Sequence, residues 1–147
     1  MRARDVMVEV PRVRPDDPAG VLVELIGDPG SRVVAVVKDG GEVVGVVTEE
    51  DLLSALLPAY VLADRSLARV LEERAGEESR ERLEGRRVRD VVDVHRRDRP
   101  TVEPDDTLIE VATAMARSND PGVLVVEEGR VLGVITVGQL LDALLRR

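Results

Sequence analysis

The stretch that decides the fold is Gly45-Val46-Val47-Thr48-Glu49-Glu50-Asp51-Leu52-Leu53, because a closely similar one returns near the C-terminus as Gly133-Val134-Ile135-Thr136-Val137-Gly138-Gln139-Leu140-Leu141. In both stretches β-branched residues lead into a Thr, and leucines at helical spacing follow it. The sequence therefore predicts two junctions at which a strand ends and a helix begins, with a Thr at each.

Each junction has a functional and a structural interpretation. The first amides of a helix lack intrahelical partners and the helix dipole is positive there, so Thr48 can help to hold a phosphate while an acid one turn on binds a sugar. The alternative is a capping box, formed by Thr48 with Asp51 and by Thr136 with Gln139. In isolation each motif favours the cap, because the pattern is common at helix starts. The repetition favours a binding site.

Composition limits the classes of partner and chemistry. The chain has 147 residues, 44% of them hydrophobic, which is enough for a core that must be aliphatic, since the aromatic residues number one Tyr and no Phe or Trp. The formal net charge of −8 predicts neither a nucleic-acid partner nor an anionic membrane partner. There is no Cys and no apolar run long enough to cross a membrane. We expect a cytoplasmic protein.

The two junctions belong to an internal duplication. Three landmarks recur in the same order at separations of 85, 89 and 88 residues, namely Asp5 with Asp90, Pro15 with Pro104 and Thr48 with Thr136. Such a nearly constant separation indicates two copies of one unit with small insertions or deletions. We assign residues 1–57 to the first repeat, 58–85 to a helical, charged linker and 86–147 to the second repeat.

Both copies predict the same elements. A short extended segment leads to a Pro and then to an amphipathic helix, with Asp17 and Asp106 as candidate N-caps. Continuous apolar runs at 33–37 and 123–126 predict strands buried on both faces. Tight turns connect them to strands at 43–47 and 131–135, which end at the Thr residues. Between the copies, residues 64–75 have a helical pattern and residues 77–87 are densely charged.

Catalytic signals are lacking in the sequence. The only histidine, His95, lies in a polar segment, and neither Gly-x-Gly-x-x-Gly nor a P-loop pattern occurs. Acid pairs such as Asp16-Asp17 precede helices and are interpreted as caps. We expect no catalytic residues, no metal site and no enzymatic activity.

The duplicated β-α-β-β-α unit, with its Pro before the first helix and Gly-apolar-apolar-Thr-x-x-Asp before the last, resembles the CBS domain family. The two copies together look like one stand-alone CBS pair, or Bateman module. The resemblance implies an α/β (α+β) fold in which two tandem repeats pack sheet to sheet with pseudo-twofold symmetry. It also implies a cleft for adenosine-containing ligands and a disc-like homodimer.

Family positions transfer to this sequence residue by residue. In the first copy, Thr48 would meet a ligand phosphate and Asp51 the ribose hydroxyls, with backbone near Arg12, Val13, Val33 and Val34 lining the adenine. In the second copy the matching positions are Thr101, Val102, Gly122, Val123, Thr136 and Gln139. Gln139 stands where the family has Asp and brings no charge, so the first cleft is predicted to be the better adenosine site.

The leading hypothesis is a regulatory module that senses AMP, ADP or ATP, with no obligatory cofactor, and acts on a separate partner protein. The alternative is a ligand-free dimerisation or interaction scaffold, in which both Thr motifs serve only as caps. The intact Thr48 and Asp51 pair favours the first hypothesis, and Gln139 favours the second.

Overall fold

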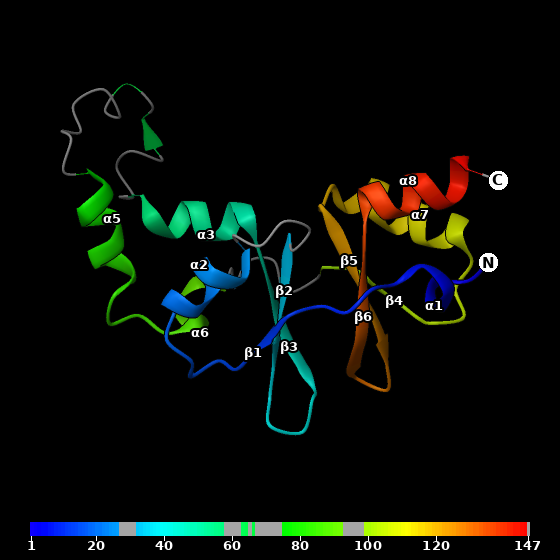
Figure 1. Cartoon of the computed structure of the whole chain (residues 1–147), viewed down its shortest axis with the longest axis horizontal. Coiled ribbons are helices and arrows are strands. Elements are labelled where there is room, and N and C mark those ends of the chain that lie inside the picture. Colours follow the sequence, from blue (N-terminus) through cyan, green and yellow to red (C-terminus); the bar gives the residue numbers. More distant parts are fainter. Residues whose placement is uncertain (27–31, 58–62, 65, 67–74, 93–98, 147) are drawn as a thin grey trace.

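The computed structural model describes the chain apart from residues 27–31, 58–62, 65, 67–74, 93–98 and 147. Two similar sets of strands and helices follow one another along it, one for each sequence repeat (Figure 1). The elements are α1 (Ala3–Val6), β1 (Arg12–Val13), α2 (Gly20–Ile26), β2 (Val33–Val37), β3 (Val43–Thr48), α3 (Glu49–Leu56), α5 (Ala75–Leu83), α6 (Val88–Val91), β4 (Thr101–Val102), α7 (Leu108–Ser118), β5 (Gly122–Glu127), β6 (Arg130–Thr136) and α8 (Val137–Leu145).

Each copy builds one three-stranded sheet, in the order β1-β2-β3 in the first and β4-β5-β6 in the second. The short outer strand pairs in parallel with the central strand, and the central strand pairs in antiparallel with the last one. In both sheets the Thr that ends the last strand lies opposite the first residue of the central strand, Val33 or Gly122. The predicted β-α-β-β-α repeats are therefore confirmed.

The two sheets pack face to face, and the helices cover their outer faces (Figure 1). All five residues of β2 are buried, as expected of a strand covered on both sides. Alternate side chains supply different cores: Val34 and Val36 face the helices of their own copy, whereas Val33 and Ala35 lie between the sheets. The cluster between the sheets also contains Val10, Val37, Leu124, Val131 and Val134. Each sheet buries this face against the other, so we expect the two halves to depend on each other for folding.

The short segment that begins each sequence repeat packs against the other copy. There the chain forms the one-turn helices α1 and α6, which the sequence did not predict, whereas the predicted extended segments before Pro15 and Pro104 are present as β1 and β4. Ala3 N donates to Asp106 O at 2.9 Å, and Val8 exchanges two backbone hydrogen bonds with Val134 at 3.0 and 2.9 Å. Val88 N correspondingly donates to Asp17 O at 2.9 Å. The exchange ties the halves together from both ends.

The predicted capping roles of Asp17 and Asp106 are wrong. The carboxylates of Asp17 and Asp106 accept from the backbone amides of Arg14 and Glu103, at 2.8 and 2.9 Å, and so close turns before the helices. The N-cap of α7 is Thr107, whose side chain accepts from the amide of Glu110 at 3.2 Å. A Thr followed three residues later by Glu is itself a capping box. Thr107 is the cap in preference to Asp106 because it directly precedes the apolar stripe.

Helix α5 of the linker lies against α3, and Arg82 Nη1 donates to Leu56 O at 3.2 Å. The predicted helix at 64–75 falls mostly outside the described residues. Across the ranges that the structure describes, every helix is too short or too polar to cross a bilayer.

Candidate ligand-binding junctions

The first junction, defined by Thr48 and Asp51, is a complete capping box at the start of α3. Thr48 N donates to Asp51 Oδ2 at 2.9 Å, and Asp51 N donates to Thr48 Oγ1 at 3.3 Å. Thr48 is only 1% exposed, because β3 delivers it into the corner between the sheet and α3. The groups proposed to meet a ligand are thus already engaged with each other.

The second junction, defined by Thr136 and Gln139, has the same geometry at the start of α8. Thr136 N donates to Gln139 Oε1 at 2.9 Å, and Gln139 N donates to Thr136 Oγ1 at 3.3 Å. The capping interpretation is therefore confirmed at both junctions. A cap and a ligand site are not exclusive, since the cap leaves other helix-start amides without intrahelical partners.

The junctions differ in one contact that the sequence reasoning missed. Arg99, just before β4 of the second copy, donates through Nη2 to both carboxylate oxygens of Asp51, at 2.9 Å to Oδ2 and 3.2 Å to Oδ1. The side chains are 11% exposed for Arg99 and 7% for Asp51, so this ion pair is buried and joins the two copies. The Nη1 atom of Arg99 is buried and has no hydrogen-bond partner among the residues that the structure describes.

A signal for this contact exists in the repeat itself. Residues 99 and 10 are 89 positions apart, the same separation as Thr101 and Arg12 in the paired outer strands. The first copy has Val10 where the second has Arg99, and Val10 is buried between the sheets. The first junction therefore has Asp51 with Arg99 of the other copy. At the equivalent positions, the second junction has Gln139 with Val10.

The other site residues predicted in the first copy do not all lie beside Thr48. Val33 lies directly opposite Thr48, whereas Arg12 pairs with Ala35, two positions farther along β2. Val13 and Val34 are buried in the core beneath the helices, so that only their backbone is left to line a ligand. Arg12 is exposed and donates through Nη2 to the carbonyl of a residue in β6 at 3.2 Å.

The second copy repeats this arrangement. Gly122 lies opposite Thr136, while Thr101, an exposed residue, pairs two positions farther along β5. Val102 and Val123 are buried beneath the helices of the second copy. A Cβ atom on Gly122 would lie 3.0 Å from Val33 Cγ2, so the two central strands approach each other at their junction ends.

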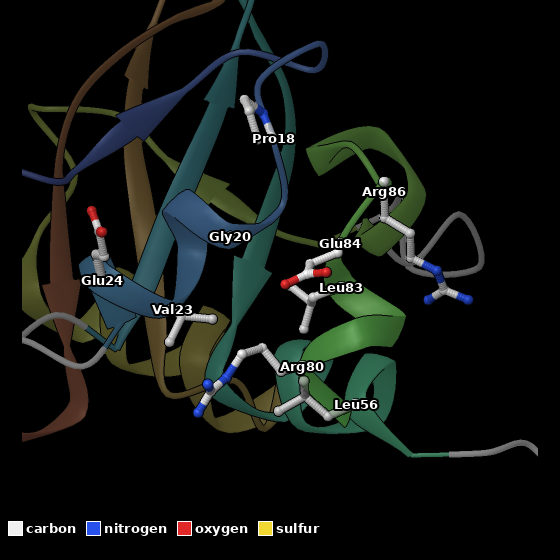
Figure 2. A pocket seen from close by; sticks show the side chains of 10 residues that line it. Pro18, Gly20, Val23, Glu24, Leu56, Arg80, Leu83, Glu84 and Arg86 are labelled. Carbon is white, nitrogen blue, oxygen red and sulfur yellow. The ribbon is translucent and has the colours of Figure 1, made fainter. Parts of the chain in front are cut away.

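One surface hollow lies away from both junctions. It encloses about 780 Å³ between α2, α3 and α5, where Val23, Leu56 and Leu83 form an apolar floor (Figure 2). Glu24, Glu84, Arg80 and Arg86 supply its charged rim. A second hollow, of about 610 Å³, adjoins the turn at Lys38–Glu42. Neither is lined by the residues that the sequence predicts for ligand binding.

Comparison with known proteins identifies the family. The CBS domain model matches residues 3–58 and 88–146, and these segments correspond to the two copies seen in the fold. The chain belongs to the CBS domain family, as a tandem pair of domains, and CBS domain proteins of this kind are regulatory modules. No curated protein matches the chain significantly in sequence.

Solved structures share this architecture over the whole chain. A CBS domain-containing protein of unknown function from Kribbella flavida is 33% identical, with a TM-score of 0.80 and 98% of each chain covered. CBSX2 of Arabidopsis thaliana, in complex with AMP, is 21% identical, with a TM-score of 0.70 and 98% and 96% of the two chains covered. The CBS pair of MJ0100, in complex with 5′-methylthioadenosine and S-adenosylmethionine, is 18% identical, with a TM-score of 0.69 and 98% and 99% covered.

Proposed function

We propose that this protein is a non-catalytic sensor of adenosine nucleotides, with AMP, ADP or ATP bound at the first junction, and that it acts on a separate partner protein. The observation that carries the proposal is the placement of a buried Thr and a buried carboxylate at a helix start facing the second copy. A ligand there touches both halves, so its binding can change how they pack.

The chemistry of the first junction suits a nucleotide. The carboxylate of Asp51 accepts hydrogen bonds from hydroxyl groups, as a vicinal diol on ribose requires. The hydroxyl of Thr48 and the leading amides of α3, which has eight residues, offer donors to a phosphate. Two structural relatives hold AMP, or 5′-methylthioadenosine with S-adenosylmethionine, which supports an adenosine-type ligand for this fold.

A homodimer is the second part of the proposal. Large apolar side chains remain exposed on the helical faces of both copies, with exposed fractions of 59% for Leu53, 67% for Ile109 and 50% for Leu141. A second copy covering these faces would remove them from water, at roughly 25 cal/mol per Å² of apolar area. Light scattering at micromolar concentration should give about twice the 16.0 kDa of one chain.

The alternative function is a ligand-free scaffold, and one observation favours it specifically. At the first junction the caps and the Arg99 ion pair already use the hydrogen-bonding groups of Thr48 and Asp51. Burial of both side chains also restricts entry. On this alternative the exposed helical faces would be the functional surface.

A thermal-shift screen separates the two functions. The compounds are AMP, ADP, ATP, S-adenosylmethionine, NAD and cyclic dinucleotides. A ligand at 100 times its dissociation constant stabilises the native state by about 2.7 kcal/mol. At about 2–4 °C per kcal/mol, the melting temperature should rise by roughly 5–10 °C. Flat melting curves for every compound would favour the scaffold.

A further inference from the structure

The hydrogen-bonding capacity of Asp51 limits what can bind at the first junction. A carboxylate offers about four acceptor positions. In Asp51, Thr48 N takes one of them and Arg99 Nη2 makes two further contacts. A ribose diol needs two acceptor positions, so it can bind Asp51 only if Arg99 gives up at least one contact.

Displacing Arg99 is costly unless the guanidinium finds another acceptor. Its side chain is 11% exposed, and its buried Nη1 atom finds no partner within the described parts of the chain. Burying an unpaired charge is among the largest penalties in protein interiors. A guanidinium carries five N–H donors in a fixed fork that fits a phosphate or carboxylate through two parallel hydrogen bonds. An anionic group on the ligand therefore compensates for the lost ion pair.

The start of α3 offers the anionic group of a ligand little positive charge of its own. Its first turn carries Glu49, Glu50 and Asp51, three acids whose charge already offsets the positive end of the helix dipole. Glu49 is held by Arg32 at 3.3 Å, in an exposed ion pair. Arg32 is thus engaged elsewhere, and the buried cation beside Asp51 is Arg99.

We propose that Arg99 determines ligand specificity at the first junction: it occupies the Asp51 carboxylate in the free protein and yields it to a ligand that carries both a diol and an anionic group. The inference rests on the proposed nucleotide-sensing function and names the class of ligand, a phosphorylated nucleoside rather than a neutral one. Binding would exchange an ion pair between the two copies for two contacts to one ligand.

The test compares adenosine with AMP, which share the diol and differ in the phosphate. Isothermal titration calorimetry at fixed ionic strength should show wild-type protein binding AMP more tightly than adenosine. We define the ratio as the dissociation constant of adenosine divided by that of AMP. In Arg99→Gln this ratio should fall at least tenfold, because adenosine no longer displaces an ion pair and AMP loses its guanidinium partner.

A matched control is Arg89→Gln. Arg89 also belongs to the second copy and pairs with an acid of the first, Asp16, at 3.0 Å, but both side chains are exposed. This variant removes the same charge and should leave the ratio unchanged. If Arg99→Gln does not fold, Arg99→Lys retains the charge without the fork and should lower the ratio several-fold.

The outcomes separate the two proposals. Binding with a ratio that stays within twofold of wild type in the folded Arg99 variants would overturn the specificity role alone. No heat with either compound, in wild type or in the Arg99 variants, would overturn both this role and the nucleotide-sensing function. Adenosine binding that appears only in Arg99→Gln supports both.

Discussion

The first and second junctions have the same caps, but the first carries a buried ion pair where the second is uncharged. Hydrogen bonds within each Thr pair are 2.9 and 3.3 Å long in both copies. At the first, a buried carboxylate faces a buried guanidinium contributed by the other copy. At the second, the corresponding residues are the neutral Gln139 and Val10. The two copies thus share the same capping geometry and differ in the charge of the residues at the junction.

On the proposed function, the difference would let one junction serve folding and the other sensing. A neutral cap stabilises its helix without depending on the other copy. A charged cap that pairs across the two copies links the packing of the halves to one ion pair, which we propose is exchanged for a ligand. Such a junction gains responsiveness and loses robustness.

The largest expected effect is on stability. Asp51→Ala leaves Arg99 buried without its carboxylate, which should lower the free energy of unfolding by about 3–5 kcal/mol. The melting temperature should fall by roughly 6–20 °C, at about 2–4 °C per kcal/mol. Gln139→Ala removes only a capping contact of about 1 kcal/mol. Thermal unfolding by circular dichroism measures both.

The double variant Asp51→Gln with Arg99→Val sharpens this result, because it gives the first junction the side chains of the second. Replacing a buried ion pair as a whole is often neutral or stabilising. The double variant should therefore recover most of the stability that either single substitution loses. Additive losses would show that the two side chains act independently.

The next effect is on binding. In Asp51→Asn the side chain keeps an oxygen for the cap but loses the charge that accepts from the ribose hydroxyls. Losing one charge-assisted contact should cost about 1.5–3 kcal/mol. AMP affinity should then fall about tenfold to somewhat over a hundredfold. Gln139→Ala should change it less than threefold, and calorimetry showing the reverse order would move the better site to the second junction.

How much the sequence predicts follows from the range of the interactions involved. The central strands are predictable because apolar runs at 33–37 and 123–126 have the length and burial pattern of inner strands. The junctions are predictable because a Thr followed three residues later by an acid or amide is a local cap signal. Each of these properties depends on residues a few positions apart.

The sequence predicts less where distant segments meet. The crossing of α1 and α6 onto the opposite copies is set by tertiary packing, which local periodicity does not encode. The partner of Asp51 lies 48 residues away, and only the position-by-position comparison of Arg99 with Val10 hints at it. The cap of α7 was predictable: Thr107 and Glu110 form a stronger signal than Asp106.

A smaller effect tests the exchanged segments. A Cβ atom on Gly133 would lie 2.6 Å from the backbone oxygen of Val8, which must then move. At the equivalent Gly45 the tight contact is with the side chain of Val92, at 3.0 Å, which can adjust, and Val36 Cβ lies at an ordinary 3.9 Å. Gly133→Ala should lower stability by about 1–3 kcal/mol and Gly45→Ala by less, as measured by chemical denaturation. Equal losses would mean that the N-terminal segment is not held closely against β6.

The smallest effect should be the same at both junctions. Thr48→Val and Thr136→Val keep the side-chain volume but remove the hydroxyl that caps the helix, and each should cost about 1 kcal/mol. The cap hydrogen bonds have the same length, 3.3 Å, and both Thr residues are buried, so the geometry gives no reason for a difference in stability. Binding should separate the variants: Thr48→Val weakens AMP more than adenosine, because it loses a donor to the phosphate, whereas Thr136→Val changes neither. Denaturation with and without AMP measures both properties in one experiment. If AMP stabilises the two variants equally, the hydroxyl of Thr48 serves only as a cap, and phosphate recognition at the first junction falls to Arg99 and the helix amides.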